Sequence, residues 1–260
     1  MAENPERMAE SSERTAETHE RMAENPEKIT KNPEEITASI GRKKLRIFPG
    51  PPGSPVVYLN CFEAAEGDEV RALLFKEPSC PPHSLVLISG IDWDREMTPW
   101  PCPPLYRHSP VFSGEAESYL SLLAGTMIPL AESHLKEPGP RAVAGYSLAG
   151  LFALWSLYRT DLFRKAASVS GSLWYPGIVR FAETETLRRK PDCVYFSLGS
   201  AESSARNRVL RTVQENTGAI ALHLSEAGIR TTFVLNPGNH FVNSGERTAA
   251  GILWMLREPG

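Results

Sequence analysis

Residues 141–154 read RAVAGYSLAGLFAL, and this stretch decides the fold. A short apolar run ends at Ser147, and a helical pattern follows at once. A nucleophile elbow has this form: a buried strand, a sharp turn that exposes the serine side chain, and then a helix. Gly145 and Ala149 stand two residues either side of the serine, where bulky side chains would collide in the tight turn. The alternative interpretation is a serine in an ordinary strand-to-helix turn.

The composition is that of an ordinary globular chain. It has 260 residues, of which 41% are hydrophobic and 23% charged, which is enough for one α/β core. The net charge of -3 disfavours nucleic-acid binding, which needs a clustered basic face. No apolar run approaches the roughly 20 residues of a membrane span, and the N-terminus lacks the apolar segment of a secretory signal. We therefore expect a cytoplasmic protein that binds neither nucleic acid nor a membrane.

The four cysteines are Cys61, Cys80, Cys102 and Cys193. They show neither the spacing of a metal site nor the density of a disulfide scaffold. We expect free thiols, with one bridge between Cys80 and Cys102 left open because both lie in proline-rich loops. No metal and no organic cofactor is implied.

The N-terminal region differs from the rest of the chain. Residues 3–37 form five seven-residue repeats, ENPERMA, ESSERTA, ETHERMA, ENPEKIT and KNPEEIT. Each repeat offers at most one clear apolar position, and three contain a proline that would break a helix, which excludes a coiled coil. We expect residues 1–41 to be a disordered tail, with a partner-binding arm as the alternative, and residues 42–260 to be the catalytic domain.

After this tail, predicted strands alternate with predicted helices, separated by turn residues. The predicted strands are 45–48, 56–62, 84–89, a strand leading into helix within 141–159, 166–170, 194–198 and 231–235. The predicted helices are 68–76, 115–135 with an irregularity at Pro129, 176–189, 207–227 and 245–257. This order predicts an α/β fold with a mostly parallel, doubly wound sheet covered by helices on both faces. In such folds the site lies beyond the C-terminal ends of the strands.

A catalytic serine needs a base to take its proton, and the base needs an orienting partner. In hydrolases of this architecture an acid and then a histidine follow the serine along the chain. His240 lies in the loop after the last predicted strand, where a general base belongs, whereas His223 lies inside a helical pattern. The other interpretation of His240 is a turn histidine bonded to the backbone.

Glu202 is the only carboxylate in the loop after the strand at 194–198, and it is the candidate for orienting His240. Asp192 precedes that strand and so lies at the wrong end of the sheet. Two alternatives stay open: a solvated Glu202 paired with Arg206, and a Ser–His dyad that works without an acid.

The oxyanion formed during acyl transfer needs two hydrogen-bond donors already aimed at it. One should be the backbone N–H of Leu148, directly after the nucleophile. The other should come from the loop after the strand at 84–89, which puts Gly90 or Ile91 in place.

The loop 90–114 is expected to form a wall of the substrate pocket. Candidate substrate-binding residues in or near it are Asp92, Trp93, Asp94, Arg95, Trp100, Phe112, Trp174 and Tyr175. For each of these residues there is an alternative interpretation. The aromatic side chains would pack a lid over the site, and the charged ones would lie on the ordinary surface.

With Ser147, Glu202 and His240 in these positions, the stretch 145–154 resembles the elbow of the esterase D-type ("putative esterase") family of the α/β-hydrolase superfamily. Within that family it is most similar to siderophore (enterobactin-type trilactone) esterases. Three further stretches carry the resemblance, which covers about residues 56–256: 96–99, 161–174 and 237–241. The chain departs from the family pattern at Ala149, where glycine is usual.

The resemblance implies an α/β-hydrolase fold and a serine carboxylic-ester hydrolase acting on a small acyl or siderophore-type ester through an acyl-enzyme. Ser147 would be the nucleophile, His240 the general acid and base, and Glu202 the residue that orients His240. Two other functions stay open: an acyltransferase using the same residues, and a catalytically dead hydrolase fold that serves as a binding or scaffold module. The natural ester and the oligomeric state, homo-oligomer included, are left open too.

Overall fold

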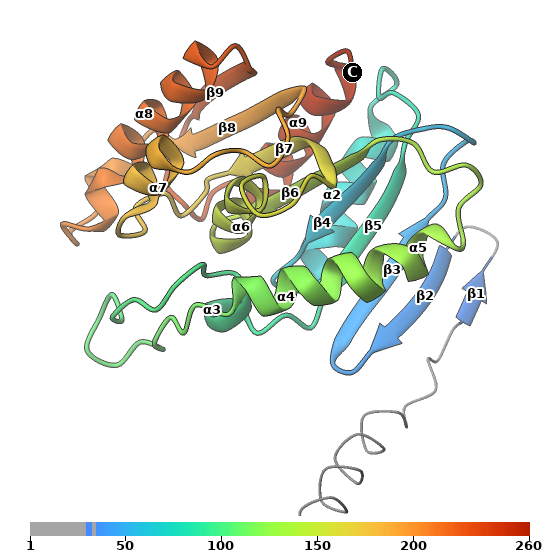
Figure 1. Ribbon diagram of the computed structural model, residues 1–260, viewed down its shortest axis with the longest axis horizontal. Helices are drawn as coiled ribbons and strands as arrows, with labels where there is room; N and C mark the ends of the chain where they lie inside the picture. Colours follow the sequence, from blue (N-terminus) through green and yellow to red (C-terminus); the bar gives the residue numbers. More distant parts are fainter. Residues whose placement is uncertain (1–29, 33–34) are drawn as a thin grey trace, which may run out of the picture.

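The structure, a computed structural model, describes residues 30–32 and 35–260, and one sheet of nine strands organises this part of the chain (Figure 1). The strands are β1 (Thr30–Asn32), β2 (Glu35–Ile40), β3 (Lys43–Phe48), β4 (Val56–Asn60), β5 (Ser84–Ser89), β6 (Arg141–Tyr146), β7 (Phe163–Val169), β8 (Cys193–Gly199) and β9 (Arg230–Asn236). Their spatial order is β1-β2-β3-β5-β4-β6-β7-β8-β9. The six strands from β5 to β9 in this order run parallel, and β1 to β3 pair antiparallel at one edge. The predicted mostly parallel sheet is confirmed.

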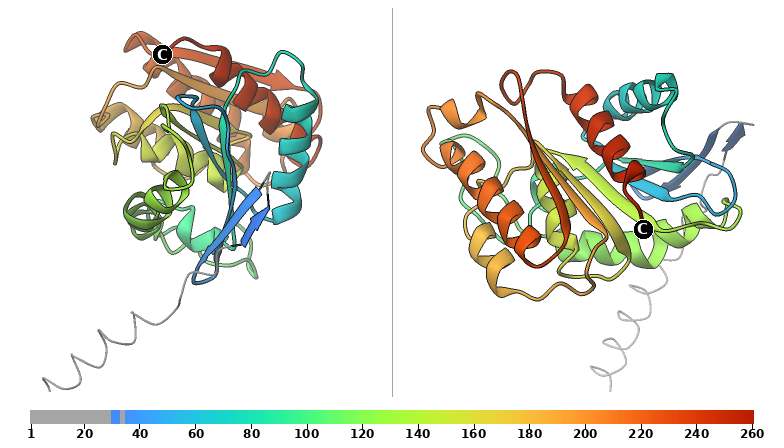
Figure 2. Two further views of the ribbon diagram at one scale, coloured as in Figure 1. Left: turned by 90° about the vertical axis from the view of Figure 1, so that its right-hand side faces the viewer. Right: turned by 90° about the horizontal axis from the view of Figure 1, so that it is seen from above.

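Helices cover both faces of the sheet (Figure 2). They are α2 (Ala64–Lys76), α3 (Trp93–Glu96), α4 (Ala116–Leu122), α5 (Ile128–Glu132), α6 (Leu148–Ser156), α7 (Ile178–Thr184), α8 (Val213–Glu226) and α9 (Ser244–Arg257), with shorter turns η1 (Leu123–Met127), η2 (Glu202–Ser204) and η3 (Leu210–Thr212). α2 and α9 pack together on one face, and α4 to α8 lie on the other. Each face has its own cluster of buried apolar side chains.

The central strands are buried at every position because helices lie on both sides of them. β4, β5 and β8 read VVYLN, SLVLIS and CVYFSLG, which are nearly continuous apolar runs. Such runs are typical of strands in parallel sheets, whereas strands with one solvated face alternate apolar and polar residues. The sequence pattern therefore placed these strands correctly.

The helix predicted at 115–135 is interrupted as expected near Pro129. α4 and α5 are joined by the π-helical turn η1, and Pro129 is the second residue after that turn. Proline has no backbone N–H to donate to the preceding turn, so the helix widens locally there. The helices predicted at 176–189 and 207–227 are shorter in the structure, at Ile178–Thr184 and Val213–Glu226.

The boundary expected at residue 41 is wrong. β2 pairs with β3 in a regular antiparallel register that runs from Ile36 opposite Ile47 to Ile40 opposite Lys43. Ala38 is fully buried, and Ile36 and Ile40 pack against the same core cluster. These alternate apolar residues have the two-residue period of a strand, which the seven-residue repeat pattern concealed. The folded domain therefore includes residues 35–41, and the rest of the expected disordered tail lies mostly outside the described residues.

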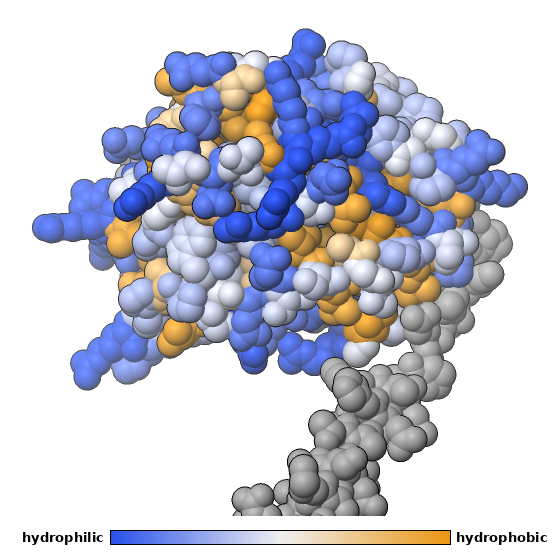
Figure 3. Space-filling view, in the orientation of Figure 1, coloured by the Kyte–Doolittle hydropathy of each residue, from blue (hydrophilic) through white to orange (hydrophobic). Residues whose placement is uncertain are grey.

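The surface carries apolar side chains in separate patches among polar ones (Figure 3). Large apolar side chains that are more than half exposed are Phe62, Phe75, Tyr106, Val111, Leu222 and Phe241. Isolated residues of this kind are ordinary on a globular surface, so only their grouping carries information. Within the described part of the chain, no helix combines the length and the apolarity needed to cross a membrane.

Candidate active site

The turn between β6 and α6 has the conformation of a nucleophile elbow. Ser147 adopts φ 57° and ψ −121°, a backbone conformation that L-residues rarely take. Its N–H donates to the carbonyl of Val169 on the neighbouring strand, and its own carbonyl accepts from the N–H groups of Gly150 and Leu151 in the first turn of α6. Strain of this kind persists where surrounding contacts over-determine the backbone, which is typical of functional sites.

Neighbouring atoms around the turn leave no room for a side chain at Gly145 or Gly150. A Cβ atom at Gly145 would overlap the Ala149 methyl group and the Ala149 backbone. A Cβ atom at Gly150 would lie 2.8 Å from Gly171 Cα. Position 145 therefore has no room for a side chain, because both the methyl group and the backbone at position 149 lie against it.

Replacing Gly145 by alanine is therefore expected to lower the free energy of unfolding by about 1–3 kcal/mol, the usual range for overpacking a tight site. Urea denaturation would measure it. Gly125→Ala is the matched control, because a Cβ there meets nothing within 4 Å, and we expect it to leave stability unchanged or raise it. Equal stability of the two variants would contradict the steric argument.

Ser147, His240 and Glu202 come together at the C-terminal ends of β6, β9 and β8. The Ser147 Oγ lies 3.1 Å from His240 Nε2, and His240 Nδ1 lies 2.8 Å from Glu202 Oε2. Because a carboxylate can only accept, Nδ1 carries the imidazole proton and Nε2 is left to accept from the serine. The histidine ring is thus bonded to two side chains and not to backbone. Glu202 pairs with His240 and not with Arg206.

Glu202 is almost buried and stays ionised. Its second oxygen, Oε1, accepts the N–H of Gly199 at 2.6 Å and lies 3.4 Å from Nη1 of Arg247. Burial by itself raises the pKa of Glu202, but the hydrogen bond and charge of His240, with the Gly199 N–H, outweigh it and hold the pKa below its ordinary value. An ionised carboxylate at this position can stabilise a positively charged imidazole.

Arg247 is a site residue that the sequence analysis missed. Its guanidinium is 3% exposed and lies within 3.5 Å of the Ser170 hydroxyl and the Tyr146 hydroxyl as well as Glu202. It also donates to the carbonyl of Pro237 at 2.8 Å, in the loop that leads to His240. The signal was present: on α9, Arg247 falls on the same face as the buried Gly251 and Met255, and a charge on an apolar face needs a partner.

Tyr146, the residue before the nucleophile, fixes the histidine loop. Its hydroxyl donates to the backbone carbonyl of His240 at 2.6 Å, and the two rings lie 5.3 Å apart. β6 therefore leads into Ser147 and also holds the backbone of His240.

The two residues predicted for the oxyanion differ in their placement. Leu148 opens α6, where the first backbone N–H groups have no acceptor within the helix. Gly90, however, follows β5, and β4 lies between β5 and β6. Gly90 sits against the backbone of Arg42, two strands from the elbow, and does not line the cavity at Ser147. The order of the strands along the chain does not show that β4, and not β5, lies beside β6 in the sheet.

The loop after β4 lies nearer to the nucleophile than the loop after β5. Asn60 pairs with Gly145 in parallel register, so Phe62 and Ser147 each stand two residues beyond a paired position. Phe62 lines the same cavity as Ser147, and its N–H donates to Glu66 Oε2 at 2.8 Å. Its backbone N–H is the candidate for the second oxyanion donor in place of that of Gly90, and it would have to release Glu66 Oε2 to act as one.

A cavity of about 490 Å³ opens beside the nucleophile, a size suited to a small-molecule ligand. Its walls are Phe62, Glu63, Glu66, Trp93, Tyr146, Ser147, His240, Phe241 and Ser244. The exposed aromatic side chains of Phe62 and Phe241, 59% and 89% exposed, belong to this cavity and were missed from the sequence. Both lie in loops that follow the C-terminal ends of strands, Phe62 after β4 and Phe241 after β9, which is where ligand-contacting side chains are expected.

Of the eight candidate substrate-binding residues named from the sequence, only Trp93 lines this cavity, where its ring packs edge-on against Phe62. Asp92 points toward Arg42, 3.5 Å away, in a separate hollow. Trp100 donates through Nε1 to the carbonyl of Pro176 and packs on neighbouring rings, so it holds the long loop in place. Trp174 is 9% exposed and packs against other aromatic rings.

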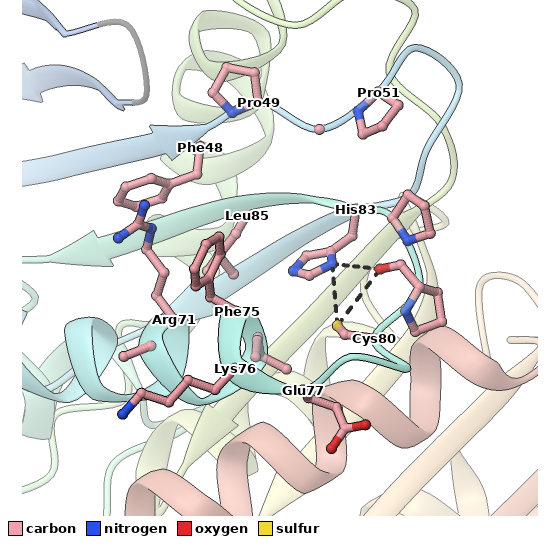
Figure 4. A pocket seen from close by; sticks show the side chains of 15 residues that line it. Phe48, Pro49, Pro51, Arg71, Phe75, Lys76, Glu77, Cys80, His83 and Leu85 are labelled. Atoms are coloured by element: carbon pink, nitrogen blue, oxygen red, sulfur yellow. Dashed lines mark hydrogen bonds between the residues drawn. The ribbon is translucent and has the colours of Figure 1, made fainter.

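A larger cavity, about 800 Å³, lies at the opposite end of the sheet, between α2, the end of β3 and the start of β5. Figure 4 shows Cys80 and His83 in its wall, with the sulfur 3.8 Å from His83 Nδ1. Burial raises the pKa of the Cys80 thiol, so this cysteine is not an activated nucleophile. The cavity contains none of the predicted catalytic residues.

All four cysteines have free thiols, and the bridge between Cys80 and Cys102 that the sequence left open is not formed. In residues 30–32 and 35–260, no cluster of three or more histidine, cysteine or acidic side chains could hold a metal ion.

Residues 62–219 match the model of the family described as "Putative esterase". The chain belongs to this family. A relative, the uncharacterized protein YbbA of Bacillus subtilis, is 30% identical over 185 residues, which is 68% of this chain and 73% of YbbA. Membership in this esterase family makes the protein a hydrolase of esters, and the resemblance stated from the sequence is confirmed.

Solved structures of similar proteins agree with the fold expected for the family. An IroE-like serine hydrolase from Shewanella oneidensis superposes with a TM-score of 0.70 at 19% identity, covering 89% of this chain and 79% of that one. The siderophore hydrolase EstA from Aspergillus nidulans gives 0.65 at 20% identity, covering 82% and 89%. At these identities the likeness concerns the fold, and the α/β-hydrolase prediction is confirmed.

Proposed function

We propose that the protein hydrolyses a small-molecule carboxylic ester through an acyl-enzyme formed on Ser147. One observation supports this above all: the unbroken hydrogen-bond chain from Ser147 Oγ to His240 Nε2 at 3.1 Å and from Nδ1 to Glu202 at 2.8 Å, starting at a strained elbow. These are the distances at which a base can take the proton of a nucleophile.

In the acylation step, the Ser147 oxygen attacks the ester carbonyl carbon while its proton passes to His240 Nε2. The carbonyl oxygen becomes an oxyanion, for which the N–H groups of Leu148 and Phe62 are the proposed donors. The carbon–oxygen bond to the alcohol then breaks, and the departing oxygen takes the proton back from His240. Glu202 stabilises the positively charged imidazole between these two transfers.

In the deacylation step, His240 takes a proton from water as the water oxygen attacks the acyl-enzyme. The bond between the acyl carbon and Ser147 Oγ breaks, and the serine oxygen recovers a proton from His240. The acid product leaves, and the resting state returns with no net change in the protein.

The cavity lining supports a substrate with apolar surface close to the scissile bond. Three of its walls are the aromatic rings of Phe62, Trp93 and Phe241, and its only charged side chains are Glu63 and Glu66. The names of related proteins as siderophore hydrolases, EstA among them, make a siderophore-type ester a candidate substrate beside simple acyl esters. The cytoplasmic location expected from the sequence stays a prediction.

A fluorophosphonate probe tests the proposal, because it labels only a serine whose oxygen is activated. We expect stoichiometric labelling, mapped by mass spectrometry to the peptide that contains Ser147, together with turnover of p-nitrophenyl acetate. The heat-unfolded protein is the control and should not react. Absence of both labelling and turnover in the folded protein would favour the scaffold hypothesis.

A further inference from the structure

A second serine, Ser172, touches the nucleophile. It lies in the turn after β7, and its Oγ is 3.3 Å from Ser147 Oγ. Its backbone N–H also donates to the carbonyl of Ser147 at 2.9 Å. The Ser172 side chain is 2% exposed, so water does not compete for this contact.

Counting protons shows which of the two hydroxyl groups, Ser147 or Ser172, donates the hydrogen bond between them. Ser147 has one hydroxyl proton, and its acceptor is His240 Nε2, because the other ring nitrogen donates to Glu202. The Ser147 oxygen can therefore only accept from Ser172. Among the described residues, no other oxygen or nitrogen lies within hydrogen-bond distance of the Ser172 hydroxyl. The Ser172 O–H thus points at the oxygen that must become the nucleophile.

The backbone that carries Ser172 is held by close packing against the elbow. A Cβ atom at Gly171 would overlap the Ser168 hydroxyl, and Gly171 Cα also limits position 150 on α6. Ser170, just before it, adopts φ 42°, and its N–H donates to the carbonyl of Ser197 at 2.8 Å. The Ser172 hydroxyl is therefore placed in advance, as a catalytic donor has to be.

We propose that the Ser172 hydroxyl is a catalytic hydrogen-bond donor to Ser147 Oγ, acting mainly when the acyl group leaves the enzyme. The inference rests on the proposed function of Ser147. Ser172 forms no covalent bond, and its proton stays on its own oxygen throughout. The group it serves is the serine oxygen, which carries partial negative charge whenever its bond to hydrogen or to the acyl carbon is partly broken.

The two half-reactions use this donor differently. In acylation, a hydrogen bond to Ser147 Oγ eases removal of its proton but also makes the oxygen a weaker nucleophile, so the two effects oppose each other. In deacylation, the same oxygen is the leaving group, and a donor aimed at it stabilises the negative charge that develops as the acyl–oxygen bond breaks. Loss of the donor should therefore slow deacylation more than acylation.

The experiment measures both half-reactions by stopped flow with p-nitrophenyl acetate, where a burst reports acylation and the steady state reports deacylation. For Ser172→Ala we expect the deacylation rate constant to fall about 10-fold and the burst rate constant by less than about 3-fold, the size expected for one neutral hydrogen bond. Fluorophosphonate labelling of Ser147 should persist. Ser172→Cys, with a weak donor of similar size, should recover part of the loss.

Ser156→Ala is the matched control, since Ser156 is a fully buried serine at the far end of α6 whose hydroxyl donates to the carbonyl of Ala153. It should keep both rate constants. Equal loss in the two half-reactions, or wild-type kinetics in Ser172→Ala, would overturn the role of Ser172. Failure of the wild-type protein itself to show labelling and turnover would instead contradict the proposed function.

Discussion

Replacing Ser147 by alanine is expected to lower kcat for p-nitrophenyl acetate by about 10⁴- to 10⁶-fold, the loss seen when a serine hydrolase loses its nucleophile. The reason is that no other group lies where it could take over: the neighbouring Ser172 is 3.3 Å from Ser147 Oγ and makes no hydrogen bond to His240 among the described contacts. Steady-state hydrolysis and fluorophosphonate labelling measure the loss.

The thermal midpoint of Ser147→Ala should stay within a few degrees of the wild type, since only one hydroxyl is removed. Ser133→Ala, in the turn after α5, is a control at a serine remote from the cavity and should keep full turnover. Unchanged hydrolysis by Ser147→Ala would remove the nucleophile assigned here and with it the acyl-enzyme mechanism.

Replacing Glu202 by glutamine is expected to lower kcat by about 10²- to 10⁴-fold with little change in KM. A neutral amide cannot stabilise the charged imidazole, and it can hold His240 in the wrong tautomer by donating to Nδ1. The same experiment separates a triad from a Ser–His dyad, because a dyad would tolerate the change. Exposed Glu185, which pairs with Arg159 at 3.4 Å, offers the control Glu185→Gln, for which full activity is expected.

Glu202→Gln should also lower the free energy of unfolding by about 1–3 kcal/mol, because Arg247 loses its buried counter-charge. The folded-state pKa of Glu202 lies below its unfolded value. Ionised Glu202 therefore stabilises the fold at pH values above the unfolded pKa, and this contribution is lost as the pH falls through the folded pKa. The difference in stability between wild type and variant should shrink in acid, which urea denaturation across pH would measure.

The sequence was sufficient for features that are local or that follow from chain order. The elbow at Ser147 is recognisable because small residues and the change from strand to helix pattern fall within ten positions. His240 and Glu202 were found because parallel strands deliver their following loops to one edge of the sheet. The structure brings these three side chains within hydrogen-bond distance of one another.

Features that depend on which elements pack side by side could not be predicted from the sequence. Gly90 was chosen because its strand precedes the elbow strand, but β4 occupies the place beside β6. Ser172 and Arg247 meet the site only through packing of a turn and of the closing helix. The apolar face of α9 signals that Arg247 needs a buried partner but not which one, and a single serine carries no such signal. The start of the domain was misplaced because the repeat pattern, which ends at residue 37, overlaps the first residues of β2 (Glu35–Ile40).

Arg247 gives the last helix of the chain a part in catalysis. Through it, α9 holds the carbonyl of Pro237 and the carboxylate of Glu202, although α9 carries none of the three residues of the hydrogen-bond chain. Partial detachment of α9 would withdraw a buried cation from beside Glu202 and release the loop that carries His240. Heat or a C-terminal truncation would then silence the enzyme while most of the sheet remains folded.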